Sequence, residues 1–322
     1  MWVATLGSHS ALNILEGAQS EGFKTLLICE RARTFYERFA IADEILYVDT
    51  LAEMGSRRIQ DTLCERDAVV VPHGSFISYL DLDFIEHEFK PKIFGNRNVF
   101  RWESDRTLER EWLQDAGLVM PALFSSPDEV DRKVIVKFFG AAGGAGYFVS
   151  DDRREIEGRT AGRRYQMQEF VSGVPIYFHY FYSPLTGELE LSSIDKRYET
   201  NIDAIYRYSW EDPSFLVVGN IPVVVRESLL QEVFDMGEAV CASAKKLFGG
   251  LWGPFCLEAV ITDKPEIVVF EISARIVAGT NPFIPYSPYS YLKHRCPMSA
   301  GRRIAVEIKR AEEEGRLEEV LS

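Results

Sequence analysis

Two glutamates in the last third of the chain, Glu258 and Glu271, occupy positions from which they could bind one metal ion together. Each lies within a run of β-forming residues, 255–262 and 267–275, and the four residues between the runs have the composition of a turn. A hairpin that pairs the last residue of the first run with the first residue of the second places Glu258 directly opposite Glu271. Alternation along the second strand puts Arg275 on the same face as Glu271.

Opposed carboxylates in an antiparallel pair need a positive charge between them, because like charges directly opposite each other destabilise a sheet. Mg²⁺ fits this position, since it typically takes one or two carboxylates and completes its shell with substrate phosphates. A register slip is the alternative, and it would turn one glutamate inward and the other outward. The pairing therefore predicts a metal site formed by Glu258 and Glu271.

The composition is that of a folded globular protein, with 46% hydrophobic and 26% charged residues among 322. This length predicts two or three compact units. The net charge of −13 argues against nucleic acid and against an anionic membrane as partners. The five cysteines form no C-x-x-C pair, which favours free thiols in a reducing compartment, with the disulfides of a hyperthermophile as the alternative. The chain has neither a signal-peptide pattern nor an apolar run of about 18 residues, so we expect a cytoplasmic protein.

The first 95 residues alternate between apolar runs and helical patterns, which predicts a parallel α/β domain. We expect its strands at 2–6, 25–29, 45–48 and 68–71. The first and fourth strands end in polar, glycine-containing turns that carry His9 and Ser75. Because such turns lie at the carboxyl edge of a parallel sheet, where ligands bind, we expect the two to face one cleft. A role as a helix cap or turn residue is the alternative for each of them.

A lysine inside an apolar run, Lys137, is followed by a glycine-rich segment at 140–146 and then by another β-prone run. The segment therefore joins strand to strand, and it lacks the G-K-[ST] ending of a P-loop. A flexible glycine loop that closes over phosphates, with a strand lysine reaching toward them, suits nucleotide binding. A glycine-rich hairpin whose edge lysine prevents strand pairing is the alternative.

The remaining chain predicts further strands and two helices. The β-prone runs lie at 165–171, 176–182 and 189–194, and the amphipathic helices are expected at 227–247 and 304–321. The stretch from Asp195 to Glu199 is too polar for the preceding core strand to continue through it. An exposed ion-pair network is the alternative to a functional cluster at this stretch.

These features together resemble the ATP-grasp ligases, which combine a strand lysine, a glycine-rich loop between strands and a late hairpin with paired glutamates that ends in E-x-x-x-R. Within that superfamily the chain resembles the archaeal PurP family, the 5-formaminoimidazole-4-carboxamide ribonucleotide synthetases. The stretches that carry the resemblance span nearly the whole sequence: Gly7–Leu12, Pro72–Phe76, Phe94–Asn98, Arg101–Arg106, Arg197–Glu199, Gly219–Pro222, Gly250–Glu258 and Glu271–Asn281.

The resemblance implies an N-terminal parallel α/β domain (residues 1–95) followed by an ATP-grasp fold of two α+β subdomains. These are a lid subdomain with the glycine-rich loop (96–190) and a C-terminal subdomain with the metal site (191–322). The implied reaction is the ATP-dependent formylation of AICAR with formate, by way of formyl phosphate, to give FAICAR, ADP and phosphate. A homo-oligomer is also expected.

The resemblance assigns roles to single residues as well. Mg²⁺ or Mn²⁺ would lie between Glu258 and Glu271, and Arg275 would act on the transferred phosphoryl group. AICAR would contact His9, Ser75 and Asn220. The ATP phosphates would be held by Lys137, Gly140, Gly143, Gly144 and Gly146. Adenine would contact Gln168, Glu169, Phe170 and Val171, and the ribose hydroxyls would bind Glu199.

The glycine-rich loop departs from the pattern of the family. Ala142 and Ala145 stand where the family carries Lys or Arg. The segments around 151–164 and after residue 205 are shorter than usual, and the loop at 282–286 also differs. Two alternatives follow, a diverged paralogue that binds nucleotide without turnover and an ATP-grasp ligase with a different acceptor.

Overall fold

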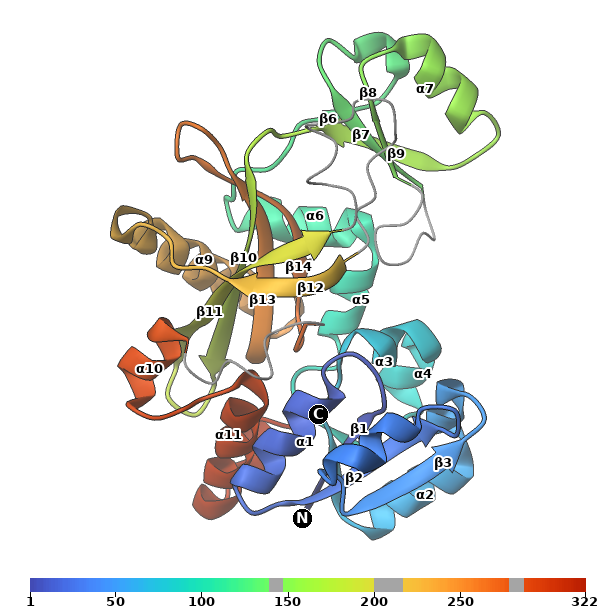
Figure 1. Cartoon of the computed structure of the whole chain (residues 1–322), viewed down its shortest axis with the longest axis vertical. Coiled ribbons are helices and arrows are strands. Elements are labelled where there is room, and N and C mark those ends of the chain that lie inside the picture. The colour runs from blue at the N-terminus through green and yellow to red at the C-terminus, as the bar shows by residue number, and fades with distance from the viewer. Residues whose placement is uncertain (139–146, 200–216, 278–286) are drawn as a thin grey trace.

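The computed structural model describes residues 1–138, 147–199, 217–277 and 287–322 of the chain. These residues form a mixed α/β architecture built on three β-sheets. In Figure 1 the N-terminal sheet lies at the bottom, the longest strands cross the centre and a small sheet lies at the top. None of the helices within the described ranges combines the length and the apolarity needed to cross a membrane.

The N-terminal domain contains a five-stranded parallel sheet, as the alternating pattern predicts. Its strands, in the spatial order β3-β2-β1-β4-β5, are β1 (Trp2–Leu6), β2 (Lys24–Glu30), β3 (Glu44–Val48), β4 (Ala68–Val70) and β5 (Lys92–Ile93). The four predicted strands are confirmed, whereas β5 escapes prediction because two residues are too few to form a hydropathy pattern. The helices are α1 (Ala11–Ser20), α2 (Arg57–Glu65), α3 (Gly74–Tyr79), α4 (Leu82–His87), η1 (Thr34–Phe39) and η2 (Leu51–Gly55).

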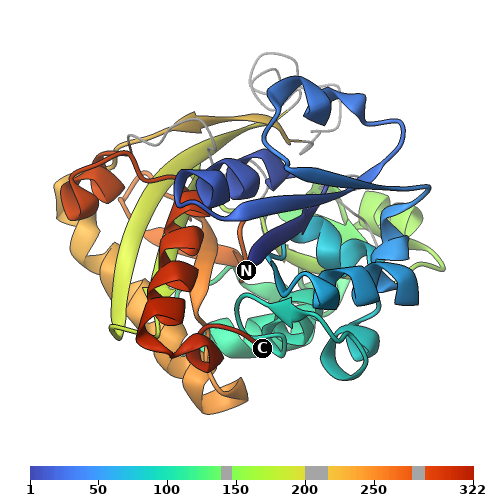
Figure 2. The same ribbon diagram turned by 90° about the horizontal axis from the view of Figure 1, so that it is seen from below.

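The C-terminal helix α11 (Ala300–Glu314) packs against α1 of the N-terminal domain (Figure 2). Two glycines make the close crossing possible, since a Cβ on Gly17 would lie 2.1 Å from the Arg302 nitrogen and one on Gly301 would lie 2.1 Å from the Asn13 carbonyl oxygen. The backbone nitrogen of Gly301 also donates to Asn13 Oδ1 (2.8 Å). The helix is shorter than the predicted 304–321, because Gly315 adopts φ +67° and ends it before the short turn η5 (Leu317–Glu319).

The small sheet at the top lies within residues 96–190, the predicted lid subdomain. Helices α5 (Val99–Ser104) and α6 (Arg106–Asp115) lead toward it, and its elements are β6 (Leu123–Phe124), η3 (Pro127–Glu129), β7 (Val134–Phe138), β8 (Phe148–Ser150), α7 (Arg153–Thr160) and β9 (Tyr165–Glu169). The order is β6-β9-β7-β8 with antiparallel pairing. The prediction that the glycine-rich segment joins strand to strand is confirmed, because it connects β7 to its partner β8.

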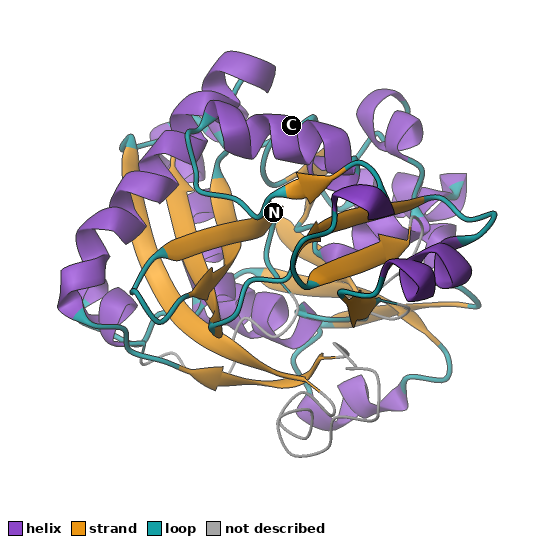
Figure 3. Cartoon of the chain, turned by 90° about the horizontal axis from the view of Figure 1, so that it is seen from above, coloured by secondary structure: helices purple, strands orange, loops and turns teal. Residues whose placement is uncertain are grey.

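The central sheet is antiparallel and carries the predicted hairpin. Its strands, in the order β12-β11-β10-β13-β14, are β10 (Val174–Ser183), β11 (Glu188–Glu199), β12 (Val217–Pro222), β13 (Gly253–Ile261) and β14 (Ile267–Ser273). The helices that follow or precede them are η4 (Glu227–Leu229), α9 (Leu230–Phe248) and α10 (Pro288–His294). Figure 3 shows the long curved strands of this sheet with helices along its outer side.

The expectation that the strand breaks at Asp195 is wrong, because β11 continues through to Glu199. Its polar side chains find partners on other strands of the sheet, which the hydropathy of one strand cannot reveal. Asp195 is buried, and its Oδ2 lies 2.7 Å from Nε2 of His179 on β10. The domain boundaries at 95 and 190 stay proposals, and the second falls inside β11.

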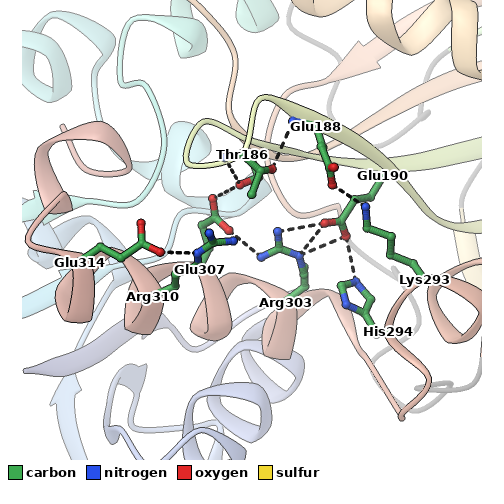
Figure 4. A network of polar contacts seen from close by, with 10 residues as sticks. Thr186, Glu188, Glu190, Lys293, His294, Arg303, Glu307, Arg310 and Glu314 are labelled. Atoms are coloured by element: carbon green, nitrogen blue, oxygen red, sulfur yellow. Dashed lines mark hydrogen bonds and ion pairs between the residues drawn. The ribbon is translucent and has the colours of Figure 1, made fainter.

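An ion-pair network ties the C-terminal helix to the central sheet (Figure 4). The buried Arg303 on α11 lies between Glu190 on β11 (Nη2 to Oε1, 3.0 Å) and Glu307 one turn along its own helix (Nη1 to Oε2, 2.8 Å). His294 on α10 lies 2.9 Å from Glu190 Oε2. Burial disfavours the ionised form of Glu190, but hydrogen bonds from His294 and Arg303 lower its pKa to about 2. Glu190 is therefore ionised at neutral pH.

We expect Arg303→Met to destabilise the protein by about 3–5 kcal/mol, because it leaves buried carboxylates without their cation. Arg310→Ala is the matched control on the same helix, since Arg310 forms an exposed ion pair with Glu314, and it should lower the free energy of unfolding far less than Arg303→Met. Guanidinium unfolding of both variants measures the difference. Equal costs for the two variants would contradict a stabilising role of the buried network.

Candidate functional site

The hairpin β13–β14 places Glu258 opposite Glu271, as predicted. The register at the turn differs by one residue from the expected one, because Ile261 pairs with Ile267. A β-bulge restores the predicted pairing, since Phe270 is the extra residue between the partners of Ala259 and Glu258. The two carboxylates therefore share one face of the sheet.

Glu258 is a buried carboxylate whose two oxygens both contact one cation, the guanidinium of Arg197. Nη2 of Arg197 lies 2.8 Å from Oε1 and Nη1 lies 3.2 Å from Oε2, and Ser273 Oγ donates to Oε1 (3.2 Å). Burial raises the pKa of Glu258, Arg197 opposes this shift and Glu271 adds to it. Arg197 thus offsets part of the repulsion between the two glutamates.

Lys137 brings a positive charge from the lid to the same place. Its side chain is buried, and its Nζ lies 5.5 Å from the ring centroid of Phe270 on β14. Burial lowers the pKa of Lys137, while the carboxylates of Glu271, Glu109 and Glu258 act in the opposite direction. The predicted phosphate-binding lysine and the predicted metal ligands therefore lie in one electrostatic environment.

The donor set suits a magnesium–nucleotide complex. Glu258 and Glu271 offer carboxylate oxygens and Ser273 a hydroxyl, and these hard oxygen donors are what Mg²⁺ prefers. Within the described ranges, His, Cys, Asp and Glu side chains form no group of three or more that could hold a metal without other ligands. Phosphate and water oxygens would complete the shell of an Mg²⁺ ion held by these residues, as is usual for Mg²⁺ at nucleotide sites.

Arg275 continues from β14 into the junction with the N-terminal domain. Its Nη2 lies 2.7 Å from Oε1 of Glu103 on α5, and Oε2 of the same glutamate accepts from the Ala274 nitrogen (2.9 Å). Nη2 also lies 3.4 Å from the position that a Cβ on Gly74 would take. Nε of Arg275 is buried and has no hydrogen-bond partner in the described part of the chain, which leaves one donor for an anion.

Two buried glutamates on the linking helices hold the edge strand β14. Glu109 Oε1 on α6 accepts from the Ile272 nitrogen (2.8 Å), and Glu103 Oε2 accepts from the Ala274 nitrogen. Burial raises the pKa of both carboxyl groups. Sequence reasoning missed both residues. Glu103 lies in a stretch that carries the family resemblance, whereas nothing in the sequence distinguishes Glu109 from a surface glutamate.

The turns that carry His9 and Ser75 lie side by side, which confirms that they share one edge of the sheet. Ser75 Oγ donates to Ser8 Oγ (2.9 Å), and the rings of His9 and His73 have centroids 5.7 Å apart. His73 is buried, with Nε2 2.9 Å from the Leu6 carbonyl oxygen. Binding of AICAR by His9 and Ser75 stays a prediction.

The N-terminal turns also border Arg275. A parallel bridge pairs His73 with Ile276, so the ends of β4 and β14 meet. Desolvation lowers the pKa of His9, and the positive charges of Arg275 and Arg33 lower it further. His9 adopts φ +41°, and because its pKa is lowered it is a neutral imidazole at pH 7 beside this junction.

Asn220 lies on β12, the edge opposite β14, where its Nδ2 donates to Oδ2 of Asp195 (3.2 Å). The same oxygen binds His179. Burial opposes a charge on His179, but its neighbours Cys256 and Asp195 raise the pKa of His179 to about 10. The described contact thus ties Asn220 to a buried ion pair, and a contact with AICAR stays a prediction.

The residues predicted to face adenine lie where the lid joins the central sheet. Gln168 is buried on β9, and Glu169 forms an ion pair with Arg132 (3.4 Å). The nitrogen of Phe170 donates to the Lys133 carbonyl (2.9 Å), and Val171 begins the passage to β10. The predicted glycines Gly140, Gly143, Gly144 and Gly146, like Ala142 and Ala145, lie outside the described residues, and Glu199 is described only as the last residue of β11.

Arg106 is a cation of the site that sequence reasoning missed. It is the first residue of α6, and its Nη2 donates to the hydroxyl of Tyr147, which follows the glycine-rich segment (3.0 Å). Burial disfavours its charge, but Tyr147, Glu271 and Glu109 together raise the pKa of Arg106. The charged stretch from Arg101 to Arg106 is the signal in the sequence that marks it.

Comparisons with known proteins identify the family. A family model described as "Domain of unknown function (DUF1297)" matches residues 152–322, and one described as "Protein of unknown function (DUF1246)" matches residues 3–124. Over 339 residues the chain is 50% identical to the 5-formaminoimidazole-4-carboxamide-1-(beta)-D-ribofuranosyl 5'-monophosphate synthetase of Pyrococcus horikoshii, with 99% of each covered. The chain belongs to this synthetase family.

Solved structures agree with membership of the synthetase family. The crystal structure of an IMP biosynthesis protein PurP from Thermococcus kodakaraensis aligns with a TM-score of 0.83 and 32% identity over 99% of this chain and 100% of that one. The ADP complex of purK, an N5-carboxyaminoimidazole ribonucleotide synthetase, aligns with a TM-score of 0.67 at 14% identity over 93% and 74% of the two chains, which shows a shared fold alone. The predicted ATP-grasp fold and the predicted family are confirmed.

The buried imidazole of His73 predicts how the stability of this synthetase depends on pH. Burial lowers the pKa of His73 to about 3, and the hydrogen bond to Leu6 opposes this shift only in part. Imidazole in an unfolded chain has a pKa of about 6.5. Between these values the unfolded chain binds one proton more, so the free energy of unfolding falls as the pH falls. From pH 6.5 to pH 5 this loss is about 2 kcal/mol.

His73→Gln keeps a donor near Leu6 and removes the titrating ring. Over the same fall in pH, its free energy of unfolding should therefore decrease by about 2 kcal/mol less than that of the wild type. Urea unfolding of both proteins at pH 7 and pH 5 measures this difference. The values at pH 7 give the cost of the substitution itself. Parallel pH dependences of the two proteins would show that the ring is protonated in the folded state.

Proposed function

We propose that the chain catalyses the ATP-dependent formylation of AICAR with formate to FAICAR, a step of IMP biosynthesis. The observation that carries this proposal is the convergence of Lys137, Glu258, Glu271 and Arg275 beside the paired N-terminal turns. The name of the Pyrococcus relative, a synthetase of the formylated carboxamide ribonucleotide, supports the choice of product.

In this proposal the nucleotide lies between the lid and the central sheet. Lys137, Arg106 and the glycine-rich segment hold the phosphates, residues 168–171 border adenine and Glu199 serves the ribose. Glu258 and Glu271 hold Mg²⁺ or Mn²⁺, which when bound neutralises charge on the phosphate oxygens. The cations on both sides of the phosphates offset the charge that develops during transfer.

The reaction proceeds in two steps. A formate oxygen attacks the terminal phosphorus of ATP, and ADP leaves with the electron pair of the broken P–O bond. The free Nε–H of Arg275 is available to an oxygen of the transferred group. The amine of AICAR then attacks the carbon of formyl phosphate, phosphate leaves, and the nitrogen loses one proton. His9, neutral at pH 7, offers a base at the mouth of the junction.

Release of ADP tests the proposed function. Protein mixed with Mg-ATP, formate and AICAR should release ADP in proportion to FAICAR, and omission of any one substrate should reduce the signal to background. Binding of ATP and AICAR without turnover in calorimetry would instead support the nucleotide-binding paralogue. Turnover that requires a different amine would support a ligase with another acceptor. A homo-oligomer and a cytoplasmic location stay predictions.

The two glutamates should respond differently to substitution. Glu271→Gln should abolish metal-dependent turnover and melt at or above the wild-type temperature in EDTA, because it removes one of two opposed charges. Glu258→Gln should also abolish turnover but melt lower in EDTA, because Arg197 loses its buried partner. Both variants should lose most of the stabilisation that Mg-ATP gives the wild type.

Differential scanning fluorimetry with EDTA and with Mg-ATP measures these melting temperatures. A Glu271→Gln variant that melts far lower in EDTA, yet gains as much as the wild type from Mg-ATP, would show that the carboxylate supports the fold instead of the metal. The assignment of the metal site would then be wrong.

A further inference from the structure

The guanidinium of Arg197 lies where a metal ion bound to Glu258 would compete with it. Arg197 projects from β11 across the neighbouring strand β10, and its guanidinium carbon lies 4.1 Å from the ring centroid of Tyr177. Beyond that ring its two terminal nitrogens contact the two oxygens of Glu258, at 2.8 and 3.2 Å. The side chains of Arg197 and Glu258 are 15% and 5% exposed, so water screens the pair weakly.

The two glutamates of the hairpin differ in this respect. Glu258 carries a two-pronged ion pair and a hydrogen bond from Ser273 Oγ (3.2 Å). Glu271 has no cationic nitrogen within 4.0 Å among the described residues and is only partly buried. One carboxylate of the proposed metal pair is therefore open to a cation, and the other already holds one.

We propose that Arg197 is a place-holding cation that positions Glu258 when the metal is absent and leaves this carboxylate when the metal binds. The proposal depends on the proposed role of Glu258 as a metal ligand. A buried carboxylate without a counter-charge is costly, and the planar guanidinium matches both of its oxygens. A metal that uses the same oxygens has to displace at least one prong of this fork. The aromatic face of Tyr177 continues to support the cation after the exchange.

Binding of Mn²⁺ alone to the protein, measured by electron paramagnetic resonance, tests the exchange without relying on turnover. Wild type, Arg197→Gln and Arg197→Lys are compared in the absence of nucleotide. Lysine keeps the positive charge but loses the fork. We expect both variants to bind Mn²⁺ about tenfold more tightly than the wild type, because one charge-assisted hydrogen bond to Glu258 no longer has to break.

The lysine variant separates the proposal from simple charge repulsion. If only the local positive charge weakens metal binding, Arg197→Gln gains affinity while Arg197→Lys binds Mn²⁺ as the wild type does, and the proposal is overturned. A crystal structure with Mn²⁺ gives a second readout. We expect at least one Glu258 oxygen to have neither terminal nitrogen of Arg197 within hydrogen-bond distance, and an intact two-pronged pair beside the bound metal would overturn the proposal.

Glu258→Gln distinguishes failure of this inference from failure of the proposed function. If Glu258→Gln binds Mn²⁺ as tightly as the wild type, Glu258 is no metal ligand and both proposals fall. If Glu258→Gln loses Mn²⁺ binding while Arg197→Lys remains at the wild-type affinity, the metal site stands and only the place-holding role falls. Circular dichroism of each variant confirms that the compared proteins are folded.

Discussion

Two like charges face each other on the hairpin of the central sheet, and the surroundings of this pair reflect that constraint. Glu258 is buried and lies directly opposite Glu271, so the sheet carries an electrostatic cost that has to be offset from outside the hairpin. The compensating charges come from elements far apart in the sequence. Arg197 arrives from β11 and Lys137 from the lid strand β7. The proposed nucleotide site thus surrounds two carboxylates that repel each other.

The edge strand β14 connects this hairpin to the linking helices and to the N-terminal domain. Its free backbone amides are capped by Glu103 and Glu109 from helices that join the N-terminal domain to the lid. Its continuation reaches the N-terminal sheet through the bridge between Ile276 and His73. The step from Glu271 to Arg275 is four residues, or about 13 Å in an extended chain. The strand β14 and the residues that directly follow it therefore connect the proposed metal ligands to the turns of the N-terminal domain.

The C-terminal helix α11 holds the two larger sheets together from the other side. Its glycine crossing with α1 brings it against the N-terminal domain, and Arg303 anchors it to β11. A buried, fully paired network suits this role because it fixes direction as well as distance. The small sheet lacks such a buried ion-pair network within the described residues and packs around its own small core of Val134, Val136, Phe148, Ile156 and Met167.

The sequence by itself determined those features that depend on neighbours along the chain. Alternation with period two and a polar turn identify the hairpin that carries Glu258 and Glu271, a lysine in an apolar run marks a buried strand position, and repeated strand–turn–helix patterns identify the parallel domain. Only the tertiary structure decided what depends on contacts between distant segments. The bulge at Phe270 leaves no hydropathy signal, and the ion pair between Arg197 and Glu258 joins residues 61 apart in the chain. The polar stretch from Asp195 was expected to end a strand, yet it continues one, because burial of a charge depends on a partner such as His179 that only the folded sheet supplies.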